Sequence, residues 1–128
     1  MSLSAINSKN SSGHSALMLA AYHDHYEVCR YLLSMGADPH SIDLGGNTIL
    51  MGVAFKGHLE IAQLLIQNGA DLDQKNQKGQ TALDFAQMFG RTEMVKFLKA
   101  QKHEPASFNY KETFVAWIQF FKKQFQSN

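Results

Sequence analysis

The sequence predicts an all-α repeat protein, a solenoid of helix-turn-helix units with β-turn connections. The chain has 128 residues, of which 45% are hydrophobic and 18% are charged, and this composition excludes intrinsic disorder. A shift of 33 residues superimposes three segments, Gly13-His-Ser-Ala-Leu-Met, Gly46-Asn-Thr-Ile-Leu-Met and Gly79-Gln-Thr-Ala-Leu-Asp. The same shift places Gly36-Ala37-Asp38 over Gly69-Ala70-Asp71. One such unit cannot bury its apolar side alone, so the units are expected to stack.

The first helix of each unit is expected to begin two residues after the glycine that opens the unit. Ser15, Thr48 and Thr81 occupy this position, where a side-chain oxygen can accept from a free N–H group of the helix N-terminus. Asp84 follows Thr81 by three residues, as in a capping box with the shorter acid. The apolar run Ala16–Tyr22 is the first of these short helices.

A tight turn is expected to separate the first helix of each unit from the second. Gly57-His58 makes this turn in the second unit and Gly90-Arg91 makes it in the third, because glycine accepts the backbone angles of a tight turn. The first unit has Asp24-His25 at these positions, so its turn is expected to form without glycine.

The second helix of the first unit is predicted from apolar residues at core spacing. These residues are Val28, Cys29, Tyr31, Leu32 and Leu33. Gly36 and Gly69 follow the second helices of two units and are natural residues to end them. A polar segment around residues 43–46 is then expected to form an exposed turn that leads into the next unit.

The repeat register subdivides a single domain. Residues 13–45, 46–78 and 79–103 are expected to be full repeats, 1–12 a partial N-terminal repeat with only a turn, and 104–128 a C-terminal capping helix. Within this C-terminal segment, a single apolar stripe is formed by Phe114, Trp117, Ile118, Phe121 and Phe125. Such a stripe suits a cap on the last repeat, and a helix that binds a partner or a membrane surface is the alternative.

These residues closely resemble the ankyrin repeat, whose family pattern reads roughly G-x-T-P-L-H-x-A-A-x-x-G-H-x-E, followed by an apolar helix and then G-A-D. The resemblance covers residues 6–103 and implies an ankyrin solenoid. The chain departs from the pattern with Ala16, Ile49 and Ala82 in place of the proline and with Met18, Met51 and Asp84 in place of the histidine. The family histidine ties helix to loop, so its loss implies more adaptable packing by methionine and lower stability.

The sequence predicts no enzyme, no catalytic residue and no cofactor. It contains no Gly-x-Ser-x-Gly nucleophile turn and no glycine-rich phosphate loop. Cys29 lies at a core position of the second helix, so we expect a buried thiol and not a reactive one. His23 and His25 are two residues apart, a spacing that does not share one helix face, so no metal site is expected.

Charge and hydropathy argue against two further classes of partner. The chain has 12 basic and 11 acidic residues and a net charge of +1, so no nucleic acid is expected to bind. No apolar run reaches the roughly 18–20 residues of a membrane span.

The first five residues lack the charged start and apolar core of a signal peptide, which predicts a cytoplasmic protein. A periplasmic or exported location is the alternative if a signal peptide is missing from this chain.

The resemblance implies that the partner is a protein bound on the concave face of the solenoid. By analogy with the family, the contacts come from the turn tips and from two residues near the end of each first helix. The expected partner-binding residues are Tyr22, His23, Phe55, Lys56, Met88 and Phe89 on the helices, and His14, Leu44, Asn47 and Lys78 at the tips.

Stacking of the repeats predicts two columns of these helix residues. The first column holds Tyr22, Phe55 and Met88, and the second holds His23, Lys56 and Phe89. Large apolar residues clustered on a surface indicate an interface, where aromatic residues and methionine are enriched. The alternative is that these rings pack only on their own neighbours between repeats.

The predicted function is protein–protein recognition through the concave face, by a chain that is a monomer when unbound. The alternative is a dedicated inhibitor or self-protection protein that occludes the active site of a partner enzyme, since small stand-alone ankyrin proteins of the bacterial type include such inhibitors. An inhibitor would bind one partner tightly, whereas a passive adaptor would have two separable binding faces. A membrane-associated protein held by residues 111–125 is a third hypothesis.

Overall fold

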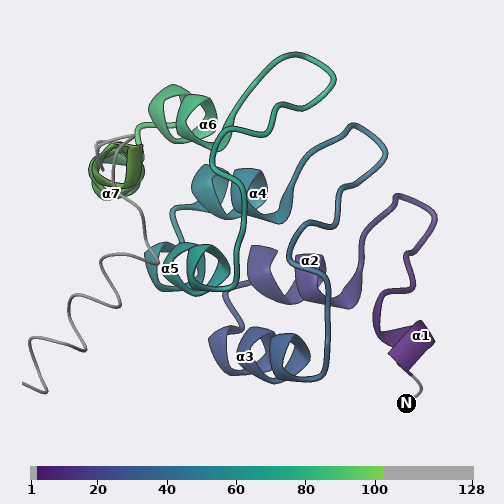
Figure 1. Ribbon diagram of the computed structural model, residues 1–128. Helices are drawn as coiled ribbons and strands as arrows, with labels where there is room; N and C mark the ends of the chain where they lie inside the picture. Colours follow the sequence, from purple (N-terminus) through teal and green to yellow (C-terminus); the bar gives the residue numbers. More distant parts are fainter. Residues whose placement is uncertain (1–2, 103–128) are drawn as a thin grey trace, which may run out of the picture.

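The computed structural model describes residues 3–102, which form seven helices and no named strand within that range. The helices are α1 (Leu3–Ile6), α2 (Ala16–Tyr22), α3 (Tyr26–Ser34), α4 (Ile49–Lys56), α5 (Leu59–Gln67), α6 (Ala82–Met88) and α7 (Thr92–Lys102). Helices α2, α4 and α6 form one row and α3, α5 and α7 form a second, while the loops between repeats project to one side (Figure 1). This arrangement confirms the all-α solenoid. The helix expected in residues 104–128 lies outside the described residues.

The first helices begin where their caps predict. Ser15, Thr48 and Thr81 each accept from the N–H group three residues ahead, which belongs to Met18 at 3.2 Å, Met51 at 3.1 Å and Asp84 at 3.2 Å. The Asp84 carboxylate also accepts from the Thr81 N–H group at 2.8 Å, which completes the expected capping box. In the second repeat the Met51 sulfur takes the role of this carboxylate and accepts from the Thr48 N–H group at 3.3 Å.

The turn that ends each first helix needs a residue in the left-handed backbone region. This residue is Gly57 after α4 and Gly90 after α6, with φ of 79° and 67°. In the first repeat Asp24 takes the same conformation with φ of 63° and is the one non-glycine residue among those described that does so. The expected turn without glycine is therefore present, although a side chain at such a φ is disfavoured.

A hydrogen bond from the following repeat secures the ends of α2 and α4. His58 Nε2 donates to the Tyr22 carbonyl at 3.0 Å, and Arg91 Nε donates to the Phe55 carbonyl at 2.8 Å. Both bonds span 36 residues and satisfy a carbonyl group that a helix C-terminus leaves free. The Gly-His position of the pattern therefore stabilises the stack, and arginine replaces histidine in the third repeat.

The connections between repeats are β-turns, as predicted. In each turn the closing glycine N–H donates to a carbonyl three residues back, in the pairs Gly13 to Asn10 at 2.9 Å, Gly46 to Asp43 at 3.0 Å and Gly79 to Asn76 at 3.0 Å. Neighbouring turns also bond to each other, since the Gln77 N–H donates to the Gly45 carbonyl at 3.2 Å. The turn tips are therefore a continuous part of the stack.

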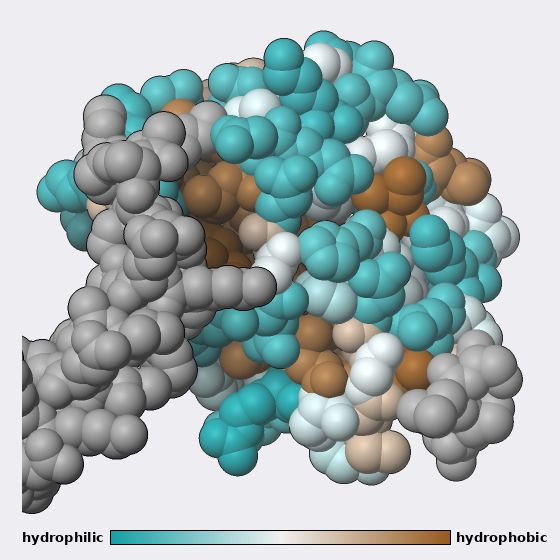
Figure 2. All heavy atoms as spheres, in the orientation of Figure 1, coloured by the Kyte–Doolittle hydropathy of each residue, from teal (hydrophilic) through white to brown (hydrophobic). Residues whose placement is uncertain are grey.

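The core lies between the two rows of helices and between successive repeats. Helix α4 contacts α2 and α6 on either side as well as α5, and α5 contacts α3 and α7. Leu50, Ile61 and Leu65 in the second repeat are at most 1% exposed. Hydrophobic residues on the face seen in Figure 2 form areas separated by hydrophilic ones. No helix among residues 3–102 is long and apolar enough to cross a bilayer.

Two residues predicted for the core of α3 lie on its surface. Cys29 and Leu32 are buried as expected, but Val28 is 49% exposed and Tyr31 is 64% exposed. The equivalent residue of Val28 in the next repeat is Ile61, which is fully buried where α5 packs on α3. Helix α3 has no such neighbour on its other side within the described residues, so the prediction was wrong for Val28 and Tyr31.

Helix α1 is an element that the sequence did not lead us to expect. Its last residue, Ile6, is buried in the apolar core. The next residue, Asn7, accepts from the Asp38 N–H at 2.8 Å and donates to the Gly36 carbonyl at 3.5 Å. Residues 3–7 therefore attach to the first full repeat, just after the end of α3, through both an apolar and a polar contact.

We predict that Gly57→Ala destabilises the fold by about 1–2 kcal/mol, because alanine at a φ of 79° is strained. The added Cβ would also lie 3.1 Å from Cδ of Arg91, which caps α4. Urea unfolding measures the change. The matched control is Gly52→Ala inside α4, which should gain about 0.5–1 kcal/mol because glycine is disfavoured inside a helix. A loss of stability in the control would contradict this account of α4.

Candidate partner-binding site

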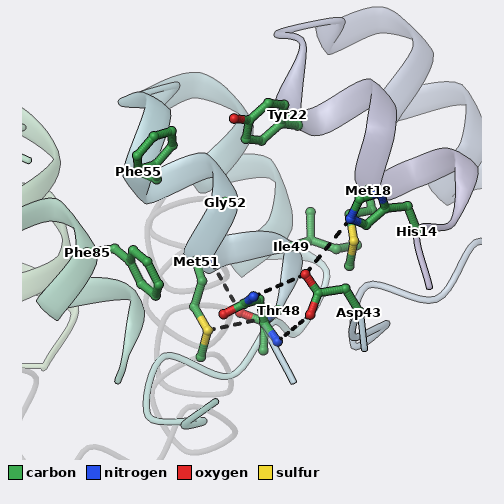
Figure 3. A pocket seen from close by; sticks show the side chains of 11 residues that line it. His14, Met18, Tyr22, Asp43, Thr48, Ile49, Met51, Gly52, Phe55 and Phe85 are labelled. Atoms are coloured by element: carbon green, nitrogen blue, oxygen red, sulfur yellow. Dashed lines mark hydrogen bonds and ion pairs between the residues drawn. The ribbon is translucent and has the colours of Figure 1, made fainter. Parts of the chain in front are cut away.

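Two adjoining hollows run between the first helices and the turns, and we call them together the trough. The first has a volume of about 200 Å³ and is lined by His14, Met18, Tyr22, Asp43, Asn47, Thr48, Ile49, Met51, Gly52, Phe55 and Phe85 (Figure 3). The second has a volume of about 480 Å³ and is lined by Gly45, Asn47, Asn76, Gln77, Lys78, Gln80, Phe85, Met88 and Phe89. Asn47 and Phe85 line both hollows, so the two hollows adjoin.

One wall of the trough is an aromatic row formed by Tyr22, Phe55, Phe85 and Phe89. The Tyr22 and Phe55 rings lie parallel with centroids 6.3 Å apart, and Phe55 meets Phe89 edge-on at 4.5 Å. The Phe85 and Phe89 rings are parallel at 6.5 Å. The row links all three repeats through ring contacts that are favourable beyond the area they bury.

The ring contacts follow the predicted first column from Tyr22 to Phe55 and then pass to a residue of the second column. Phe89, expected in the column of Lys56, is the ring that contacts Phe55. The Met88 sulfur accepts from Gln80 Nε2 at 3.8 Å instead. Helix α4 extends to Lys56, whereas α6 ends one residue earlier in the register at Met88. Equivalent residues therefore differ in their distance from the helix end, and the two columns do not stay separate in the third repeat.

The aromatic row remains partly open to solvent despite these contacts. Tyr22 is 37% exposed, Phe89 is 45% exposed and Met88 beside it is 55% exposed, whereas Phe55 is half-buried. His23 meets the Tyr22 ring edge-on at 5.4 Å. Nζ of Lys56 lies 5.0 Å from the centroid of the same ring, a cation–π distance. The rings pack on their neighbours and still present apolar surface to the outside.

The opposite wall of the trough is a chain of polar side chains, the polar chain. It contains His14, Asp43, Asn47, Asn76 and Gln80. Asn47 Nδ2 donates to Asp43 Oδ2 at 3.1 Å and Asn76 Nδ2 donates to Asn47 Oδ1 at 2.8 Å. Asn76 Nδ2 also lies 3.0 Å from Gln80 Oε1, while His14 Nε2 is 3.9 Å from Asp43 Oδ2. This chain joins the turns of neighbouring repeats and faces the aromatic row.

The structure brings most of the predicted binding residues together. Seven of them line the trough, namely His14, Asn47, Tyr22, Phe55, Lys78, Met88 and Phe89. His23 and Lys56 touch the Tyr22 ring from outside the two hollows, and Leu44 lies at a turn tip with 70% exposure. Sequence reasoning missed Asp43, Gly52 and Phe85, although the repeat register places Gly52 and Phe85 at one equivalent position.

The residues that could carry other chemistry do not form such a site. No group of three or more His, Cys, Asp and Glu side chains within residues 3–102 could hold a metal ion. His23 and His25 have ring centroids 6.4 Å apart, and both rings are exposed. The Cys29 thiol is fully buried, and its pKa is raised from 9.0 to about 11, first by burial and then by the nearby Asp24 carboxylate.

Comparison with protein families identifies the repeats. Residues 12–44 match the family model described as ankyrin repeat, and residues 35–111 match the model described as ankyrin repeats in three copies. No curated protein matches the chain. The two family matches together cover the helices of all three repeats and the turns that form the trough.

We predict that the thiol of Cys29 is unreactive in the folded chain. A rise in its pKa from 9.0 to about 11 lowers the thiolate fraction about 100-fold at about pH 8, and burial slows access further. Alkylation by iodoacetamide should therefore be at least about 100-fold slower in buffer than in urea. Comparable rates in both solvents would contradict the buried position.

The same shift predicts how stability depends on pH. Because the folded pKa lies above that of the unfolded chain, the contribution of the thiol is complete below about pH 9 and is lost as the pH rises toward about 11. Urea unfolding of the wild type and of Cys29→Ala over this range measures the difference. The free energies of the two chains should converge as the pH rises, and a constant difference would contradict the shift.

Proposed function

The chain belongs to the ankyrin repeat family, and on this premise we propose that it binds a partner protein along the trough. Ankyrin repeats are generally protein–protein interaction modules and are typically non-enzymatic. The finer proposal concerns which surface of this chain makes the contact. It assigns that contact to the aromatic row, the polar chain opposite it and the exposed residues at their edges.

The observation that carries the proposal is the exposed apolar surface of the aromatic row. Tyr22, Phe89 and Met88 keep between 37% and 55% of their surface accessible, and Tyr22 lines the first hollow while Met88 and Phe89 line the second. Partner binding would remove this surface from water, and aromatic side chains that become fully desolvated in pockets dominate the free energy of many interfaces. The proposal therefore assigns the main anchors to Tyr22 and Phe89.

We propose that the polar chain sets the orientation of the bound partner. Its amides and its carboxylate are fixed by hydrogen bonds to one another, so their positions are set before the partner arrives. Groups that are ordered in advance lose little conformational entropy on binding. The edge of the trough carries Lys56, His23 and Lys78. Charges at the edge of an interface influence the association rate and the choice of partner more than the affinity.

The inhibitor hypothesis uses the same trough and differs only in the nature of the partner. It proposes that the partner is an enzyme whose active site the aromatic row covers. The identity of the captured partner, followed by an assay of its activity with and without the chain, separates this hypothesis from a recognition module without inhibition. The unbound chain is proposed to be a monomer, which sedimentation in the absence of the partner tests.

We predict that Tyr22→Ala/Phe89→Ala prevents capture of the partner. Each truncation of an anchor is expected to weaken binding by about 2 kcal/mol or more. The wild-type and variant chains are immobilised and incubated with a lysate of the source cells, and the captured proteins are identified by mass spectrometry. The dissociation constant of the purified partner then measures the loss.

The matched control is Val28→Ala/Tyr31→Ala, which removes exposed apolar side chains from α3 outside the trough. Circular dichroism and urea unfolding verify that both variants fold. Capture by the wild type and the α3 variant, with loss only in the trough variant, is the expected result. Capture of the same protein by all three chains would exclude the aromatic row as the binding surface.

A further inference from the structure

The middle repeat differs from its neighbours at a position that opens the first hollow. Gly52 lies inside α4, where glycine is disfavoured relative to alanine. Leu19 and Phe85 occupy the equivalent positions of the other two repeats. A Cβ at Gly52 would meet one atom within 4 Å, Cδ2 of Tyr22 at an ordinary contact distance of 3.5 Å. The fold therefore tolerates a side chain here. Its absence leaves open the floor of the first hollow, which we call the Gly52 hollow.

The middle repeat differs at a second position in the same hollow. Asp43 Oδ1 closes its turn by accepting from the N–H groups of Gly45 and Asn47, both at 2.9 Å. Asn10 and Asn76 make the same pair of bonds in the turns before and after it, with distances of 2.9–3.0 Å. An asparagine therefore suffices for this turn, and the negative charge of Asp43 is not required for the fold.

The Asp43 carboxylate retains capacity for a further donor. Each carboxylate oxygen has two lone-pair sites, and Oδ1 uses both of them on the turn. Oδ2 accepts from Asn47 Nδ2 at 3.1 Å, and His14 Nε2 stands at 3.9 Å, beyond hydrogen-bond distance. One site on Oδ2 is thus left for a ligand, and Asp43 lines the hollow beside His14 (Figure 3).

The remaining walls of the Gly52 hollow suit an aliphatic stem that ends in a cation. Tyr22, Phe55 and Phe85 contribute aromatic rings, and Met18 and Met51 contribute thioethers (Figure 3). The faces of aromatic rings attract cations, and methionine adapts to irregular shapes. A cavity of about 150 Å³ is enough to hold benzene, so about 200 Å³ admits one long side chain.

We propose that the Gly52 hollow is a pocket for one basic side chain of the partner, arginine in preference to lysine. The stem lies against the rings and thioethers, and the guanidinium group donates to Oδ2 of Asp43. Arginine is preferred because its planar head is less strongly hydrated than an ammonium group and stacks on aromatic rings. This inference rests on the proposed function, since it names the chemistry that the partner brings to the trough. A neutral apolar anchor in the same hollow is the competing occupant.

The test uses N-acetyl-L-arginine amide as the probe and its neutral near-isostere, N-acetyl-L-citrulline amide, as the control ligand. The full chain is labelled with ¹³C at its methionine methyl groups. Met18 and Met51 line the hollow, and Met35 on α3 is a remote reference. The arginine probe should shift the Met18 and Met51 signals in a saturable manner and leave Met35 unchanged. The citrulline probe should bind at least about tenfold more weakly, because it lacks the charge-assisted hydrogen bond.

Two variants decide which group is responsible. Asp43→Asn keeps the turn, as Asn10 and Asn76 do, and should abolish the preference for arginine over citrulline. Gly52→Leu fills the hollow with the residue type found at Leu19 and should remove the shifts for both probes. Thermal unfolding verifies that both variants are folded.

Three results would overturn the proposal. They are equal shifts from the two probes on the wild type, an arginine preference that survives Asp43→Asn, and the absence of any shift from the arginine probe up to its solubility. The first result favours a neutral anchor in the hollow. None of the three affects capture of a partner by the aromatic row, so a failure of this proposal is distinguishable from a failure of the proposed function.

Discussion

Burial between neighbouring repeats is the constraint on which the rest of the structure depends. A pair of short helices covers little of its own apolar surface, so each pair relies on the one beside it. Val28, Ile61 and Met94 occupy one equivalent position in the three repeats. Ile61 and Met94 are at most 2% exposed, whereas Val28 is 49% exposed. The difference lies in the neighbour and not in the residue type, because all three side chains are apolar.

The same stacking creates the trough. Repetition places three first helices beside three turns, and the ends of α2 and α4 are secured by His58 and Arg91 through bonds to the preceding repeat. Tyr22, Phe55 and Phe89 at the helix ends and Phe85 inside α6 then form the aromatic row, and side chains at the turns form the polar chain. Both walls are stabilised by contacts between repeats, so a change in the stack would alter the binding surface as well as the stability.

Much of the fold could be predicted from the sequence because the 33-residue period repeats the same local signals in each unit. The bounds of α2, the three N-caps and the glycine turns follow from local rules that act within a few residues. The exposure of Tyr31 could not be found in this way, because helical spacing shows which residues share a face and not whether a neighbour covers that face. The predicted C-terminal capping helix lies outside the described residues.

Only part of the candidate site could be predicted from the sequence, because residue spacing does not show which side chains meet in the folded chain. The register located Tyr22 and Phe55 near the helix ends, but the contact between Phe55 and Phe89 depends on where α4 and α6 stop. Gly52 and Asp43 carry a signal in the sequence, as departures of one repeat from its neighbours. Their importance appears only when the structure shows that both line one hollow.

The central claim is that the trough contacts the partner, and crosslinking at single positions tests it most directly. Photoreactive benzoylphenylalanine is placed at Met88 in one chain and at Tyr31 in another, two exposed positions on different surfaces. Both chains are irradiated in the source cells, and the adducts are identified by mass spectrometry. We expect a specific adduct with one protein from position 88 and none from position 31. An adduct from position 31 alone would contradict this expectation, because the partner would then lie on α3.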